Sequence, residues 1–164
     1  MELKYGFDPK GHTGKAMTHA LTALPHDLTT AFQPDALESL TLTAMSLADR
    51  PRPKLALVRS SLGRHLFAFV WLPRDDVTTA RRIAIGEMLA KAADASILNW
   101  SIALEGGQVA LIRYTLDVRG SARAPDVAAL DAQIERMVRG WVPAVEAALA
   151  SEAGDARATR LALK

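Results

Sequence analysis

The residues that most resemble a chemical site are Gly11–Lys15, with the sequence GHTGK. In nucleotide-binding P-loops, the backbone amides of a glycine-rich loop cradle phosphates and a lysine neutralises their charge. The full motif also needs an earlier glycine and a Ser or Thr directly after the lysine. Here Pro9 occupies the position of that glycine, and Ala16 that of the hydroxyl residue. The pattern therefore favours a loop that leads into a helix over a nucleotide site.

A second pattern with chemical potential is the aromatic run FAFV at 67–70, which has Arg64 upstream. It resembles the strand motif of RNA-recognition domains, in which alternate Phe rings on a ferredoxin-like sheet stack on bases. The glycine expected after the basic residue is replaced by HL at 65–66, and the neighbouring strand carries no second aromatic motif. Single-stranded nucleic-acid binding through Phe67 and Phe69 is therefore kept as the alternative, and a buried aromatic row is favoured.

Histidines and carboxylates form no recognisable metal or acid–base arrangement. The paired spacing of zinc ligands is missing from the four histidines, which are His12, His19, His26 and His65. We interpret Asp75 and Asp76 as a charged strand end and a helix N-cap. The sequence contains no nucleophile elbow, dinucleotide-binding glycine motif or metal triad. We therefore expect a non-catalytic chain with no catalytic residue, cofactor or metal of its own.

Composition excludes several classes of protein. The 20 basic and 18 acidic residues leave a formal charge of +2, which gives no strong field for nucleic acid or an anionic membrane. The chain has no cysteine, so disulfides and thiolate metal sites are excluded. Its N-terminus lacks the basic, apolar and small-residue pattern of a signal peptide. We expect a cytoplasmic protein whose 164 residues form one main core.

Residues 1–53 are expected to hold a short strand, two helices and a connector. The first helix would run from an N-cap at Thr13 to Pro25. The second, over 34–48, starts with a proline in its first turn and has apolar residues at three-to-four spacing. The connector DRPRP at 49–53 is stiff and extended, and we place a domain boundary there.

Residues 54–72 and 97–118 each show the pattern that is typical of a β-hairpin. A turn at 61–64 joins a strand that starts at Lys54 to a strand over 65–72. A Gly-Gly turn after the half-exposed strand 97–104 starts the last strand. That strand is expected to point five residues inward, namely Ala110, Ile112, Tyr114, Leu116 and Val118.

Two amphipathic helices complete the pattern. The first is expected over 77–93, with Asp76 as its N-cap. Its inner stripe would hold Ala80, Ala84 and Met88, widened by Ile83, Ile85, Leu89 and Ala92. Gly86 costs about 1 kcal/mol relative to Ala, so it predicts a close approach to the sheet or to another helix. The second helix is expected over 126–151, with a kink at 139–143 caused by a proline.

The order of elements from Lys54 is strand, strand, helix, strand, strand, helix. A ferredoxin-like sandwich runs strand, helix, strand, strand, helix, strand, and its last strand lies beside its first. Moving that last strand to the N-terminus gives the order found here. We therefore predict an α+β, circularly permuted ferredoxin-like sandwich over 54–153. Its four-stranded antiparallel sheet would carry two helices on one face, and 154–164 would begin a further helix.

The strand over 65–72 is expected to lie inside the sheet and to be covered on both faces. Phe67, Phe69 and Trp71 alternate along one of these faces. Rings of this size would form a large apolar patch if they were left bare. We expect the helix at 34–48 or a neighbouring domain to cover them, which makes the three rings candidate interface residues.

The segment FAFVWLPRDDVTTARRIAIGEML at 67–89 resembles the large NAD-specific glutamate dehydrogenases of bacteria. In the N-terminal regulatory half of that family, a strand leads through Val-Pro-Arg-Asp into an Arg-rich helix with a Glu-x-Leu core. The residues that carry the resemblance are Leu72, Pro73, Arg74, Asp75, Thr78, Thr79, Arg81, Arg82 and Glu87. The similarity covers about 34–153. Family members often carry Asp-Arg-Tyr-Asn-Thr after the Pro-Arg, whereas this chain has DDVTT at 75–79 and so lacks the tyrosine.

The resemblance implies an ACT-like, non-catalytic regulatory domain and a chain that is a fragment of a larger enzyme. That enzyme would oxidatively deaminate L-glutamate to 2-oxoglutarate with NAD, and its Rossmann-type catalytic region is not in this sequence. The implied partners are other domains of the same subunit, further copies of the parent and a small-molecule effector, with no membrane and no nucleic acid. The implied interaction residues lie at a strand–helix edge: Pro73, Arg74, Asp75, Thr78, Thr79 and Arg81.

Overall fold

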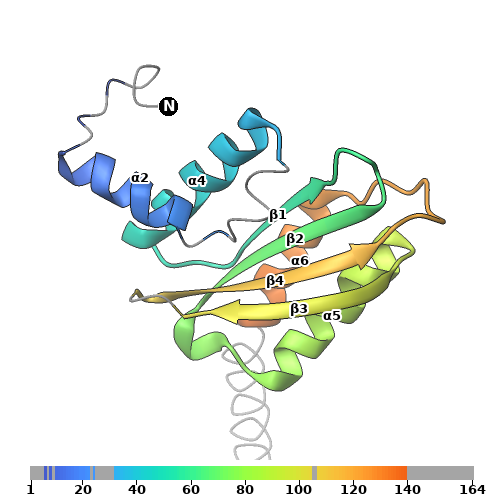
Figure 1. Cartoon of the computed structure of the whole chain (residues 1–164). Helices are drawn as coiled ribbons and strands as arrows, with labels where there is room; N and C mark the ends of the chain where they lie inside the picture. The colour runs from blue at the N-terminus through green and yellow to red at the C-terminus, as the bar shows by residue number, and fades with distance from the viewer. Residues whose placement is uncertain are drawn as a thin grey trace, which may run out of the picture.

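The computed structural model of the chain describes residues 6, 8, 10–22, 24, 32–104 and 107–139. The strands are β1 (Lys54–Arg59), β2 (His65–Pro73), β3 (Ser96–Ala103) and β4 (Val109–Asp117). The helices are α2 (His12–Thr22), α4 (Pro34–Asp49), α5 (Thr79–Ala93) and α6 (Val127–Arg139), and the 3-10 turn η1 covers Arg74–Asp76. Figure 1 shows one sheet, with α2 and α4 on one side and α5 and α6 on the other.

The sheet has the strand order β1-β2-β4-β3, and all three neighbouring pairs are antiparallel. β1 therefore lies at an edge beside β2, where the last strand of a ferredoxin-like sandwich lies beside its first. β2 pairs on both sides and forms the centre of the sheet together with β4. This arrangement confirms the α+β, circularly permuted sandwich with two helices on one face.

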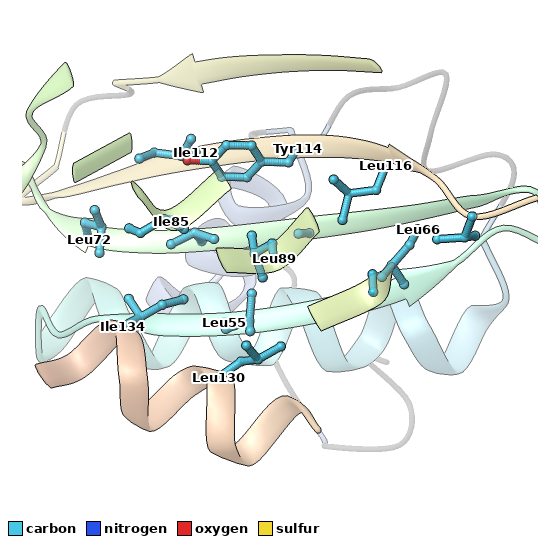
Figure 2. Packing of buried hydrophobic residues seen from close by; sticks show 14 residues of the cluster. Leu55, Leu66, Leu72, Ile85, Leu89, Ile112, Tyr114, Leu116, Leu130 and Ile134 are labelled. Atoms are coloured by element: carbon cyan, nitrogen blue, oxygen red, sulfur yellow. The ribbon is translucent and has the colours of Figure 1, made fainter. Parts of the chain in front are cut away.

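One face of the sheet forms an aliphatic core with α5 and α6. Alternate residues of β2 and β4 point into it, as strand geometry requires. In Figure 2, Ile85 and Leu89 of α5 lie over the sheet, and Leu130 of α6 lies beside Leu55 of β1. The inward row expected for β4 is confirmed, since all five residues are buried and all but Ala110 belong to this core.

Gly86 lies where α5 approaches the sheet most closely, as the sequence predicted. A Cβ placed on Gly86 would lie 3.0 Å from Tyr114 Cε1 and 3.1 Å from Ile97 Cδ1. A side chain of any size would therefore push against a buried ring. The absence of a side chain at this position allows the helix and the sheet to pack this closely.

The opposite face of the sheet is aromatic and is covered by the N-terminal segment of the chain. Phe67, Phe69 and Trp71 of β2 pack with Leu40 and Leu47 of α4, together with Leu24, Phe32 and Leu111. We use the name lid for the segment that covers this face, which consists of α2, α4, Leu24 and Phe32. The expectation that the helix at 34–48 covers the aromatic row is confirmed.

Two expectations for the first helix of the sandwich were wrong. The N-cap is Thr78 rather than Asp76, and its side chain accepts a hydrogen bond from the Arg81 N–H. Asp76 lies two residues earlier, where it belongs to the turn η1. Ala80 and Ala84 are exposed, and the buried stripe consists of Ile85, Gly86, Leu89 and Ala93. Alanines occur on several sides of this helix, so spacing alone did not distinguish its inner face.

The first N-terminal helix starts earlier than expected. α2 begins at His12, so Thr13 lies inside it rather than at its cap. Gly14 is buried within the same helix, and the GHTGK segment therefore forms a first helical turn rather than a phosphate-cradling loop. The expected strand before residue 8, the kink at 139–143 and the helix at 154–164 fall wholly or mostly outside the described residues.

Candidate functional site

The strand–helix connection after β2 gathers the interaction residues that the sequence singled out. The Arg74 N–H donates to the Gln108 carbonyl over 2.9 Å, and the Val77 N–H donates to the Arg74 carbonyl over 3.3 Å. The first bond anchors the turn to the residue before β4, and the second closes the turn itself. Arg74 and Asp75 are exposed, whereas Pro73 is half-buried. The connection is therefore a fixed turn with a charged outer surface.

The guanidinium of Arg81 is bound within this turn, so its charge is not presented to a partner. Its guanidinium donates to the Asp76 carbonyl and, over 3.1 Å, to Asp76 Oδ1. Its side chain is 17% exposed. The exposed groups available for binding at this edge are therefore Arg74, Asp75 and the start of α5, with Thr78 and Thr79.

Arg82 and Trp100 form a contact that the sequence analysis did not find. The guanidinium carbon of Arg82 lies 3.8 Å from the centroid of the Trp100 ring, a cation–π arrangement. The Arg82 carbonyl accepts a hydrogen bond from the Tyr114 hydroxyl over 2.7 Å. Burial raises the pKa of Tyr114 to about 12, although the positive charge of Arg82 opposes this shift. Trp100 lies opposite Tyr114 in the hairpin register, but no pattern in the sequence links either residue to Arg82.

β3 presents an apolar edge to solvent. Among the described strands its one neighbour is β4, so no described strand pairs with the backbone groups of its outer side. A register shift between Ile97 and Asn99 interrupts its pairing. The large apolar side chains that remain exposed on this strand and directly after it are Ile97, Leu98, Trp100, Ile102 and Leu104. We call these five residues the β3 edge patch.

The aromatic row of β2 is enclosed within the chain. Phe67 is 9% exposed, Phe69 1% and Trp71 4%. The Phe32 ring centre lies 5.3 Å from that of Phe67 and 6.0 Å from that of Phe69. Neither Phe ring can stack on a base, and the alternative of single-stranded nucleic-acid binding loses the surface that it requires. The three candidate interface residues, Phe67, Phe69 and Trp71, therefore form a contact within the chain, between the sheet and the lid.

A cavity of about 320 Å³ remains between the lid and the aromatic face. α2 and α4 supply one wall, and β2, β3 and β4 supply the other. Its apolar lining includes Leu24, Met45, Trp71, Val109 and Leu111, and its polar lining includes His19 and Gln108. Sequence reasoning missed it, because the cavity depends on how closely the lid approaches the sheet.

The described part of the chain holds neither a metal-binding cluster nor a membrane-spanning helix. That part contains no group of three or more His, Asp or Glu side chains arranged to hold a metal ion. Among the same residues, no helix combines the length and the apolar character needed to cross a bilayer.

A family model described as "Glutamate dehydrogenase, ACT2 domain" matches residues 54–142, which is more than half of the chain. The chain belongs to this family. The ACT2 match begins at the first residue of β1 and extends past the end of α6, so it contains the whole permuted sandwich. The lid, which precedes β1, lies outside it.

Two curated relatives of this ACT2 chain are similar over most of its length. The NAD-specific glutamate dehydrogenase of Halomonas elongata is 30% identical over 140 residues, which are 83% of this chain and 8% of that protein. The NAD-specific glutamate dehydrogenase of Pseudomonas aeruginosa is 26% identical over 157 residues, which are 95% of this chain and 10% of that protein. The second alignment is long enough to include most of the lid. No solved structure matches the chain.

Proposed function

We propose that this chain is a non-catalytic regulatory and assembly domain of an NAD-dependent glutamate dehydrogenase in the cytoplasm. Both relatives carry the name of that enzyme, and the chain spans about a tenth or less of their lengths. The parent protein would convert L-glutamate and NAD to 2-oxoglutarate and ammonia, with catalytic residues and the NAD site elsewhere in the subunit. The observation that carries this proposal is the ACT2 match over the complete sandwich.

The β3 edge patch supports the assembly part of the proposal. It combines an unpaired strand edge with several large apolar side chains, a combination that soluble proteins usually cover or break with charges. Arg82 holds the Trp100 ring in place, which lowers the entropy cost of using that ring in a contact. The partner at this patch would be another domain of the same subunit or a second copy of the parent.

The charged turn after β2 supports the regulatory part. Arg74 and Asp75 are exposed on a turn whose backbone is anchored to β4, so a ligand or a neighbouring domain would meet side chains on a fixed base. A small-molecule effector at this edge would contact Arg74, Asp75, Thr78 and Thr79. Arg81 and Pro73 would act by holding the turn in place.

The assembly role can be tested in the full-length parent enzyme with Trp100→Glu and Ile102→Glu. Each places a charge in the β3 edge patch, where Trp100 is 45% and Ile102 36% exposed. We expect a smaller particle by light scattering, or altered glutamate-dependent NAD reduction, with the domain still folded. Leu62→Glu makes a matched change at a turn residue that is 78% exposed, and it should leave both readouts unchanged. Normal assembly and activity in both patch variants would argue against this surface.

The effector and catalytic statements have separate tests. Isothermal titration of the 164-residue chain with amino acids, glutamate and NAD should give heat for one of the amino acids. A complete absence of heat would remove the effector and leave the assembly role standing. We also expect the isolated chain to show no glutamate-dependent NAD reduction, and measurable turnover would contradict its non-catalytic assignment.

A further inference from the structure

The cavity between the lid and the aromatic face has the size and lining of a small-molecule site. Ligand sites are typically concave, mostly apolar and about 300–1,000 Å³ in volume, with a few polar groups that orient the ligand. This cavity measures about 320 Å³. A dry apolar cavity of about 150 Å³ in another protein accommodates benzene, so this one has room for a larger ring system. Its space comes from five alanines, Ala16, Ala20, Ala44, Ala48 and Ala103.

Trp71 supplies a hydrogen-bond donor that no acceptor among the described residues uses. The side chain is 4% exposed and stacks on Phe69, yet its indole N–H takes part in none of the hydrogen bonds among the described residues. No fully enclosed side-chain nitrogen or oxygen in that part of the chain lacks a partner, so this N–H must retain some accessible surface. Buried indole N–H groups normally find an acceptor. Trp71 is one of the residues that line the cavity, and that is where we place an acceptor on a bound molecule.

The charge of the lining limits the class of ligand. Among the described residues that line the cavity there is no Lys, Arg, Asp or Glu. An ion placed there would lose hydration without gaining a counter-charge. His19 and Gln108 are exposed and lie at the mouth, where a polar end of the ligand would meet water.

We propose that this cavity binds an uncharged, largely apolar molecule of about two fused rings with one hydrogen-bond acceptor. The acceptor receives the Trp71 indole N–H, and the rings lie between the small side chains of α2 and α4 and the face formed by β2 and β4. The inference goes beyond the proposed assembly role and does not depend on it, because binding is a property of the chain by itself. A ligand held between the lid and the sheet would contact both and stabilise the folded chain.

The test uses two probes of nearly equal shape, 2-acetylnaphthalene and 2-ethylnaphthalene, with the ¹⁵N-labelled 164-residue chain. Only the first carries a carbonyl acceptor. We expect both to bind, the ketone about fivefold more tightly because of one net hydrogen bond. The ketone should also shift the indole N–H resonance of Trp71, assigned with Trp71→Phe, and leave that of Trp100 in place. In Trp71→Phe the two probes should bind equally well.

A filled cavity provides the second arm of the test. Ala44→Leu places a larger side chain in the space and should lower the affinity for both probes at least tenfold. Ala48→Leu does the same at the exposed part of the lining and is used if Ala44→Leu does not fold. Ala84→Leu, on the exposed side of α5, is the matched control and should bind as the unmodified chain does. The proposal is overturned if neither probe binds, if the ketone has no advantage, or if the filled variants bind normally.

Discussion

Replacing Gly86 with Ala should destabilise the domain, although helix propensity alone predicts the opposite. An alanine inside a helix is favoured over glycine by about 1 kcal/mol. Against this, the new methyl group would lie 3.0 Å from Tyr114 Cε1 and 3.1 Å from Ile97 Cδ1. Ile97 is 39% exposed and can rotate towards solvent, so the outcome depends on Tyr114.

Tyr114 cannot withdraw easily from a methyl group at position 86. Its ring is 2% exposed, and its hydroxyl donates to the Arg82 carbonyl, which lies one turn earlier in the same helix. The helix that brings the methyl group therefore also holds the ring in place. Overpacking a core of this kind costs about 1–3 kcal/mol. Set against the gain in propensity, the net loss is about 1 kcal/mol, or about 2–4 °C in Tm for a chain of this size.

Urea unfolding followed by circular dichroism measures this change. Ala84→Gly, at an exposed position of the same helix, gives the propensity difference alone and should lose about 1 kcal/mol. In the double variant Gly86→Ala/Tyr114→Phe the ring is released from Arg82, so the two changes should cost at least about 0.5 kcal/mol less than their sum. A Gly86→Ala chain that is about 1 kcal/mol more stable than the unmodified chain would refute the close-approach reasoning.

Three further predictions concern the hydrogen bonds and buried rings that stabilise the core. Asp131→Ala should cost about 2–3 kcal/mol in urea unfolding, because its carboxylate accepts from the Leu55 N–H over 2.7 Å and also from Lys54. Lys54→Ala should cost less than about 1 kcal/mol, since that ion pair is partly exposed. An equal loss of stability in Asp131→Ala and Lys54→Ala would contradict the larger share given to the Leu55 N–H bond. Tyr114 should ionise at about pH 12 in ultraviolet titration, because burial raises its pKa above the ordinary tyrosine value of 10.0. The free energy of unfolding should therefore fall as pH rises between these values, and ionisation near pH 10 would contradict the burial argument. Phe69→Ala should cost about 3–5 kcal/mol by thermal unfolding, and a loss below about 1 kcal/mol would show that the lid does not contribute to the core.

Most of the fold could be predicted because its decisive signals are local. The alternation in each hairpin gave the faces of β4, and an apolar strand with rings on one side and aliphatic side chains on the other indicated a central strand. Both features follow from the two-residue period of a strand. The position of Gly86 could also be interpreted, since a glycine inside an amphipathic helix has few explanations other than close packing.

The errors and omissions concern choices that only tertiary contacts decide. Asp76 and Thr78 are both good N-cap residues, and the bond from Arg81 to Asp76 keeps Asp76 in the preceding turn. The contact of Arg82 with Trp100 joins a helix to a strand and has no local pattern. The cavity arises where small side chains of two elements face each other, which is a property of their separation.

The aromatic face of β2 shows that the limits of the family and the limits of the folding unit differ. The ACT2 match begins at residue 54, yet the rings on this face are covered by Leu24, Phe32, Leu40 and Leu47. A chain cut before Lys54 would keep every hydrogen bond of the sheet and would expose Phe67, Phe69 and Trp71 to water. Such a truncation would conserve the recognisable domain and lose its solubility. Studies of ACT2 domains in isolation should therefore start well upstream of the homology border.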